Sequence, residues 1–177
     1  MKKTMIGVWT LAVMAFFSCG GNDAASEGKV QITGKIENAP EGLVVLTQYT
    51  DSRPKVLDTL EVDSNGEFTY DLEVTTPTFY ELNLYGQRAV KLALFKENVE
   101  VAYNFSDPAS LQIEGSSDSK EMLKLEKLME EYQLTVNKLN EQYYEAMSKN
   151  DAETIKRIQL DAMNLETQQA EKVKEMI

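Results

Sequence analysis

Apolar side chains recur at every second position over much of the chain between Lys29 and Gly115. In the segment KVQITGKI, Val30, Ile32 and Ile36 fall on one face and polar residues fall on the other. A period of two is typical of half-buried antiparallel strands. This pattern, or a more mixed one rich in β-branched residues, marks residues 29–36, 43–50, 55–62, 66–74, 78–85, 89–96, 98–105 and 110–115. Eight short strands at this spacing favour a sandwich or a barrel, and we predict an antiparallel β-sandwich over residues 29–115.

Turn-forming residues separate these segments. All four prolines fall between the predicted strands, as their missing N–H donor demands; they are Pro40, Pro54, Pro77 and Pro108. The pair Asn65 and Gly66 also lies between two strands. Such a pair is typical of a two-residue hairpin with a type I′ turn, in which both central residues have positive φ. We therefore predict a hairpin turn at Asn65 and Gly66.

From Ser116 onward the apolar residues are spaced by alternating steps of three and four. This spacing is typical of a helix with a coiled-coil-like seam. The predicted seam consists of Met122, Leu125, Met129, Tyr132, Val136, Leu139 and Tyr143. A polar stretch at 148–151 interrupts the pattern, and a second helix is predicted from Asp151 towards Ile177. Residues 116–177 are thus predicted to form an antiparallel α-helical hairpin, and a homodimer through the seam is the alternative.

Capping boxes are expected at the start of each predicted helix. Asp118 is followed three residues later by Glu121, and Asn150 is followed in the same way by Glu153. In such a box the first side chain bonds a backbone N–H of the first turn, and the glutamate bonds back to the cap residue. The predicted fold class is therefore α+β, with the sandwich first and the helical hairpin second.

The N-terminal residues have the order of a bacterial secretory signal. Lys2 and Lys3 precede an apolar run over residues 5–17, and the small residue Ser18 follows. The run is too short for a transmembrane helix, which needs ~20 apolar residues. The single cysteine, Cys19, stands at the expected cleavage point.

The position of Cys19 resembles that in bacterial lipoprotein signals, where the cysteine becomes the acylated N-terminus. We therefore predict a signal peptide over residues 1–18 and a flexible, polar tether over residues 19–28. The acyl chains on Cys19 would hold the protein on a membrane of the bacterial cell envelope, facing the periplasm. The alternative is an ordinary signal peptide with a cysteine near its cut.

The charge and composition restrict the possible chemistry. The chain has a net charge of −11, and without Lys2 and Lys3 it has 16 basic against 29 acidic residues. This excess repels nucleic acid. Histidine is absent and there is one cysteine, so His-based triads and Cys-x-x-Cys redox pairs are excluded for this chain. We predict no catalytic residue, no cofactor and no metal site.

One strand presents a candidate ligand face. Phe79, Glu81, Asn83 and Tyr85 alternate with the apolar residues that are predicted to be buried. Two aromatic side chains with polar groups between them are suited to binding a peptide or a sugar. The alternative is that the aromatic residues pack under a loop or against the helical hairpin.

The segments VQITGKIENAPEGLVVL, LDTLEVDSNGEFTY, LALFKENVEVAYNF and LQIEGSSDSKEM resemble the family of domain of unknown function 4369. The resemblance covers roughly residues 29–122. It is carried by Gly34, by Asp58 and Thr59, by Gly66 and Phe68, and by Gly115 and Ser116. It implies the N-terminal part of an envelope lipoprotein, in which a helical segment and then a thioredoxin-like domain with a Cys-x-x-Cys pair follow.

Three functions are compatible with these patterns. The leading prediction is a lipid-anchored envelope module, non-catalytic as given, that positions or binds a thioredoxin-like or other envelope protein. The second is a piece of a thiol–disulfide oxidoreductase whose Cys-x-x-Cys domain is missing. The third is a structural lipoprotein with a coiled-coil contact.

Overall fold

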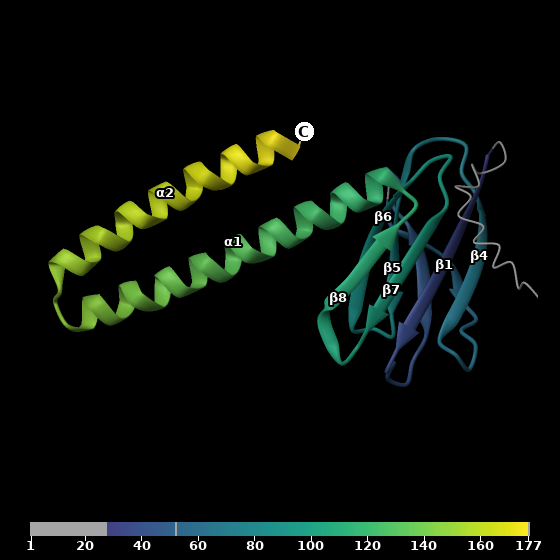
Figure 1. The fold of residues 1–177 in the computed structure, drawn as a ribbon, viewed down its shortest axis with the longest axis horizontal. Coiled ribbons are helices and arrows are strands. Elements are labelled where there is room, and N and C mark those ends of the chain that lie inside the picture. The colour runs from purple at the N-terminus through teal and green to yellow at the C-terminus, as the bar shows by residue number, and fades with distance from the viewer. Residues whose placement is uncertain (1–27, 52, 177) are drawn as a thin grey trace, which may run out of the picture.

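The computed structural model describes residues 28–51 and 53–176 (Figure 1). The predicted signal peptide, Cys19 and the tether up to residue 27 lie outside the described residues. Eight strands come first, and two long helices follow, which confirms the predicted fold class. The strands are β1 Lys29–Glu37, β2 Val44–Gln48, β3 Lys55–Leu60, β4 Glu67–Glu73, β5 Thr78–Leu84, β6 Arg88–Leu94, β7 Val99–Asn104 and β8 Asp107–Glu114. The helices are α1 Ser117–Ser148 and α2 Ala152–Met176.

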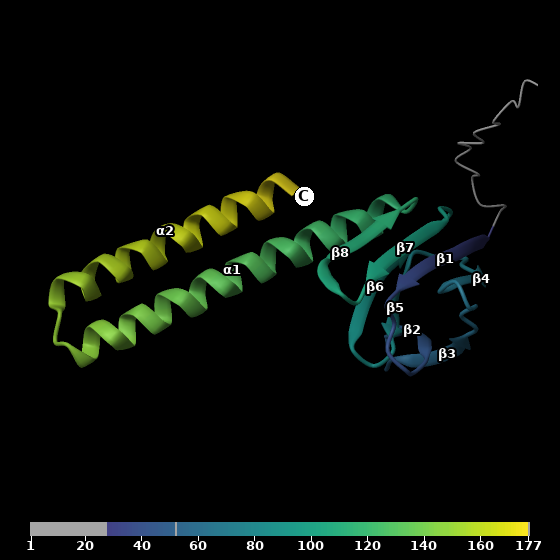
Figure 2. The same cartoon turned by 60° about the horizontal axis from the view of Figure 1, so that its bottom comes forward.

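The strands form two four-stranded sheets that pack face to face (Figure 2). One sheet has the order β4-β1-β7-β8, and the other has the order β3-β2-β5-β6. All neighbouring pairs are antiparallel except β1 and β7, which run parallel. The sequence predicted antiparallel strands throughout. Alternation reports which side of a strand is buried, but it does not report the direction of the neighbouring strand.

The core lies between the inner faces of the two sheets, where the alternating apolar residues meet. Within β1, Val30, Ile32 and Ile36 are all buried, as the alternation predicted. Leu82 and Leu84 from β5 meet them from the other sheet and are completely buried. The remaining members include Val44, Leu46, Phe68, Val90, Leu92, Val99, Val101, Leu111 and Ile113.

Gly34 marks a close approach between β1 and β4. It pairs with Phe68 in the register of the two strands. A Cβ atom at Gly34 would lie 2.2 Å from the Phe68 ring. Any larger residue at this position would therefore clash with the ring. The glycine and the phenylalanine of the family pattern therefore form one packing unit.

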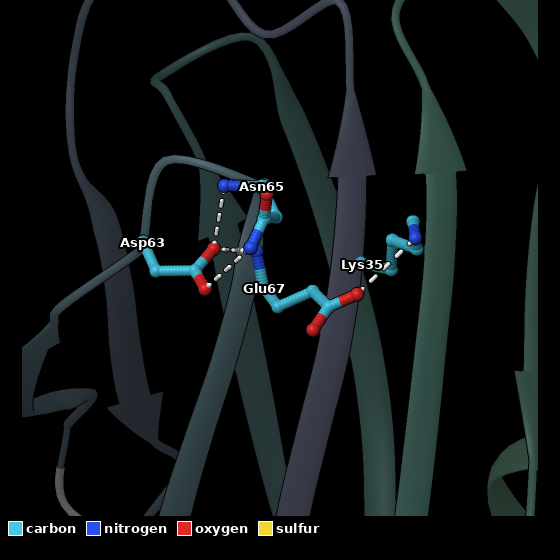
Figure 3. A network of polar contacts seen from close by, with 4 residues as sticks. All are labelled: Lys35, Asp63, Asn65 and Glu67. Atoms are coloured by element: carbon cyan, nitrogen blue, oxygen red, sulfur yellow. Dashed lines mark hydrogen bonds and ion pairs between the residues drawn. The ribbon is translucent and has the colours of Figure 1, made fainter.

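The turn at Asn65 and Gly66 is not the predicted type I′ hairpin. Gly66 has a φ of +79°, but Asn65 is not in the left-handed region. The carboxylate of Asp63 accepts the backbone N–H groups of Asn65 and Glu67, both at 2.8 Å (Figure 3). This side chain shapes the turn, which is the usual role of aspartate at such positions. In addition, β3 and β4 belong to different sheets, so the turn carries the chain from one sheet to the other.

Pro108 is not between strands, as predicted, but is the second residue of β8. The chain turns tightly at Phe105 and Ser106, and Asn104 pairs with Asp107. Proline is tolerated here because β8 is an edge strand, and the start of an edge strand needs no N–H donor.

Both helices begin differently from the predicted capping boxes. The N-cap of α1 is Ser116, whose side chain accepts the Ser119 N–H, while Asp118 lies within the first turn. Before α2, Asp151 accepts the Thr154 N–H at 3.0 Å. Asn150 has a φ of +54° and ends the preceding helix instead. Serine and aspartate are both good caps, so composition alone did not identify the residue that is used.

Candidate interaction site between the helices and the sandwich

Two serines fix the first turn of α1 to strand β6. The Ser119 hydroxyl accepts the Ala93 N–H at 2.9 Å. The hydroxyls of Ser116 and Ser119 lie 2.9 and 3.0 Å from the Ala93 carbonyl oxygen. Both serines are buried, and β6 is an edge strand, so these hydroxyls replace the partners that a further strand would supply. We call these contacts the serine joint.

Polar side chains extend this attachment along the next turns of α1. Lys127 donates to the Leu111 carbonyl oxygen of β8 at 3.1 Å. Arg88 of β6 pairs with Glu126 at 2.8 Å, and both side chains are partly buried. Because β6 and β8 are edges of different sheets, α1 covers both edges on one side of the sandwich. Covered edges do not pair with strands of other molecules.

The predicted seam faces α2, which runs back antiparallel to α1 (Figure 1). Near the connecting loop, Ala146 and Ile158 are buried. Five seam residues of α1 are partly buried: Met122 near the start of the helix, and Tyr132, Val136, Leu139 and Tyr143 along its middle. Towards the sandwich, however, Leu125 and Met129 are 40% and 47% exposed. The helix pair is therefore closed at its loop end and open at its sandwich end.

The open end of the helix pair forms a hollow against the sandwich, which we call the junction notch. Its volume is about 370 Å³. The start of β5, the end of β6, the first turns of α1 and the last turn of α2 surround it. It is lined by Pro77, Thr78, Phe79, Ala93, Leu94, Asp118, Glu121, Met122, Leu125, Val173 and Met176. Most of these side chains are apolar, and two carboxylates stand among them.

The structure does not bring the predicted ligand face together as one surface. Phe79 is 57% exposed and belongs to the junction notch. Glu81 accepts a hydrogen bond from the Tyr49 hydroxyl at 2.7 Å, and Asn83 accepts the Gly86 N–H. Tyr85 has a φ of +55°, which breaks the alternation, and its ring packs edge-on against Phe105 beside the core.

A second hollow lies at the opposite end of the sandwich. Its volume is about 1140 Å³, and its lining is drawn from the loops after β1, β3 and β5. Glu37, Glu61 and Asp63 contribute carboxylates to it, and Leu43 and Tyr85 contribute apolar surface. The Asp63 carboxylate is already used within its own turn.

In five side chains of the described residues, the pKa is displaced away from neutrality. Burial raises the pKa of Tyr70, Tyr80 and Tyr85 above the usual value for tyrosine. Backbone hydrogen bonds lower the pKa of Asp63 and Asp151 below the usual value for aspartate. A general acid or base works best with a pKa near the working pH. These five groups are moved away from neutrality, so they are not suited to that role.

Within residues 28–51 and 53–176, no three cysteine or carboxylate side chains are grouped closely enough to hold a metal ion. In the same part of the chain, neither helix combines the length and the apolar character of a membrane span.

The model of one protein family, a domain of unknown function (DUF4369), matches residues 30–122. These 93 positions are more than half of the 177-residue chain. The chain belongs to the DUF4369 family. In this DUF4369 protein the matched range extends from β1 to Met122 in α1, so it contains the serine joint. The family residues Gly34, Phe68 and Ser116 all have structural roles here, in packing and in capping.

A comparison with solved structures gave a crystal structure of a candidate cell adhesion protein from Bacteroides ovatus ATCC 8483. The two chains are 11% identical, and the TM-score is 0.28. The alignment covers 51% of this chain and 43% of the other, which is less than half of that protein. A comparison with curated protein sequences gave no match.

The sequence identified some of these residues and missed others. Met122 and Leu125 were predicted as seam residues and Phe79 as an exposed aromatic residue, but nothing indicated that they share one hollow. The roles of Ser116 and Ser119 in holding β6 were missed. The signal that was available was the Ser-x-x-Ser spacing directly after the last strand, at the position where a helix needs a cap.

Proposed function

We propose that this DUF4369 protein is a non-catalytic accessory module of the bacterial cell envelope that binds another envelope protein. The observation that carries this proposal is the junction notch. There, Phe79 of the sandwich and Leu125 of α1 are both exposed in an apolar hollow. Apolar surface of this kind, with polar residues beside it, is typical of sites where proteins bind one another.

The way the hollow is built also supports a binding role. One wall is rigid, because the serine joint ties the start of α1 to β6. The other wall is the end of α2, and among the described residues α2 makes extensive contacts with α1 alone. A site with one fixed wall and one adjustable wall can close on a partner without disturbing the sandwich core.

The helical hairpin adds a second surface for contact. It projects well beyond the sandwich (Figures 1 and 2). Its outward faces carry apolar side chains that neither helix covers, among them Leu134, Tyr144, Leu160 and Met163. A partner held in the notch would lie beside this arm.

We place the module at a membrane through acyl chains on Cys19, facing the periplasm. The order of charge, apolar run and small residue before Cys19 supports this. Mass spectrometry of the protein extracted from membranes of its source bacterium tests it. The expected result is an N-terminal Cys19 with added acyl chains, and an unmodified Cys19 in that material would rule the anchor out.

The partner suggested by the family resemblance is a thioredoxin-like protein or domain. The chain has no Cys-x-x-Cys pair, so the redox chemistry would belong to the partner. In an insulin-reduction assay we expect the purified chain to give only the background rate. A rate above background would contradict the non-catalytic role.

Photo-crosslinking in intact cells tests the docking role. A photoreactive amino acid replaces Leu125 in the notch or, as a control, Thr69 on the exposed face of β4. We expect one envelope protein to be crosslinked from position 125 and little or nothing from position 69. Equal yields from both positions would show that the notch is not a docking site.

A further inference from the structure

The junction notch has a size and lining suited to a bulky apolar side chain. Its volume of about 370 Å³ lies near the lower end of ligand pockets, which span ~300–1,000 Å³. Met122 of α1 and Met176 of α2 both line it, as does Phe79. Methionine side chains are flexible and polarisable, so they adapt to the shape of an inserted group and make favourable contacts with aromatic rings.

The charge around the notch is negative. Asp118 and Glu121 line it. Lys124 offsets part of this charge by pairing with Glu121, but both side chains are largely exposed, and such pairs are weak and readily exchanged.

The total charge of the chain argues against a second copy as the occupant. The chain carries a net charge of −11, which disfavours the approach of a second copy relative to that of a basic polypeptide. The same charge disfavours anionic lipid surfaces and nucleic acid. A polypeptide with basic residues beside an apolar side chain is attracted instead.

We infer that the junction notch binds a bulky apolar side chain of a different polypeptide, and that lysine or arginine residues flank that side chain. The apolar group contacts Met122 and Met176, which line the notch, and the basic groups meet Asp118 and Glu121. This inference rests on the proposed docking function and specifies the chemistry of the partner.

Synthetic peptides test the inference with the purified full chain. The probes are short peptides with a central tryptophan between two pairs of lysines, the same peptide with alanine at the centre, and the same peptide with glutamates in place of the lysines. Calorimetry or fluorescence anisotropy measures each affinity. We expect the tryptophan–lysine peptide to bind at least about tenfold more tightly than either other peptide, and added salt to weaken it. Equal affinities for all three peptides would overturn the inference.

Two leucines of α1 provide a matched pair of variants. Leu125→Arg places a charge in the notch, whereas Leu134→Arg places the same charge on the outward face of α1. Leu125 is 40% exposed and Leu134 is 65% exposed, so both variants should fold, which circular dichroism checks. We expect Leu125→Arg to lower the affinity for the tryptophan–lysine peptide about tenfold or more. We expect Leu134→Arg to leave this affinity within about twofold of the native value. Equal losses in both variants would show that the peptide binds elsewhere.

The outcomes separate this inference from the proposed function. If no peptide binds but position 125 still crosslinks one envelope protein in cells, the docking role stands and the assigned chemistry is wrong. If sedimentation shows a dimer of the full chain that Leu125→Arg abolishes, the occupant is a second copy and the inference fails. If neither peptides nor crosslinks appear, both proposals fail.

Discussion

The sandwich and the helical hairpin bury their apolar residues to very different extents. In the sandwich, side chains such as Ile32 and Leu82 have no exposed surface. In the hairpin, Leu134 and Met163 are each about two-thirds exposed. Two packed sheets enclose a core from both sides, whereas two helices meet along a single seam. The sandwich is therefore expected to be stable by itself, and the hairpin to depend on its joint with the sandwich.

Truncation of one leucine in each region gives the largest expected difference. Leu82→Ala should destabilise the protein by about 2–5 kcal/mol, because it leaves a cavity in a close-packed core. Leu139→Ala, in the partly buried seam, should cost less than about 1.5 kcal/mol. Urea denaturation of the full chain measures both. Equal losses would mean that the hairpin and the sandwich unfold as one unit of comparable packing.

Gly34→Ala tests the tightest contact within the sandwich. The new Cβ would lie 2.2 Å from the Phe68 ring, so the ring must move, at a cost of about 1–3 kcal/mol. A second substitution, Phe68→Leu, removes the ring and should make Gly34→Ala much less harmful. A double-mutant cycle measures this coupling. Additive effects would show that the two residues do not constrain each other.

Ser119→Ala tests the joint between the two regions. It removes the acceptor of the Ala93 N–H, and a buried group without a partner costs about 1–3 kcal/mol. Hydrogen exchange should show faster exchange of the Ala93 amide and of the first turn of α1. Ser148→Ala at the exposed end of α1 is the control, and it should change stability by less than about 0.5 kcal/mol. Unchanged exchange at Ala93 would contradict the role of the serine joint.

The smallest expected effect is the pH dependence at Asp63. The N–H groups of Glu67 and then Asn65 hold the pKa of this carboxyl below its ordinary value of 3.8 (Figure 3). A lowered folded-state pKa stabilises the fold fully above the unfolded-state pKa, and this contribution is lost as the pH falls through the folded-state pKa.

Thermal unfolding of the native chain and of Asp63→Asn measures this contribution. The native chain should have the higher midpoint at neutral pH, and the difference should shrink as the pH falls below 3.8. A difference that stays constant with pH would mean that the charge of Asp63 does not matter.

The sequence predicted the positions of the strands and helices better than it predicted which strands pair. The strand and helix segments followed from periods of two and of 3.5, because these periods arise within one segment. The parallel pairing of β1 with β7 was not predicted, because it depends on which strands meet across the sheet. Tyr85 was placed on the wrong surface, because its positive φ interrupts the alternation at the end of β5.

The candidate site was predicted only in fragments. Phe79 was recognised as an exposed aromatic residue, and Met122 and Leu125 as seam residues, each from its own local pattern. Val173 and Met176 complete the hollow from the far end of the chain. These residues come together only because α1 crosses the edges of both sheets and α2 returns along α1.

By itself the sequence determined an acidic chain without histidine, a strand-rich half with its buried faces, a helical half with one seam, and the candidate lipidation site at Cys19. Only the tertiary structure decided the order of strands in the two sheets, the serine joint and the junction notch. The physical reason is the range of the interactions. Periodicity and composition are set by neighbours along the chain, whereas Phe79 and Val173 are brought to one hollow only by the packing of layers.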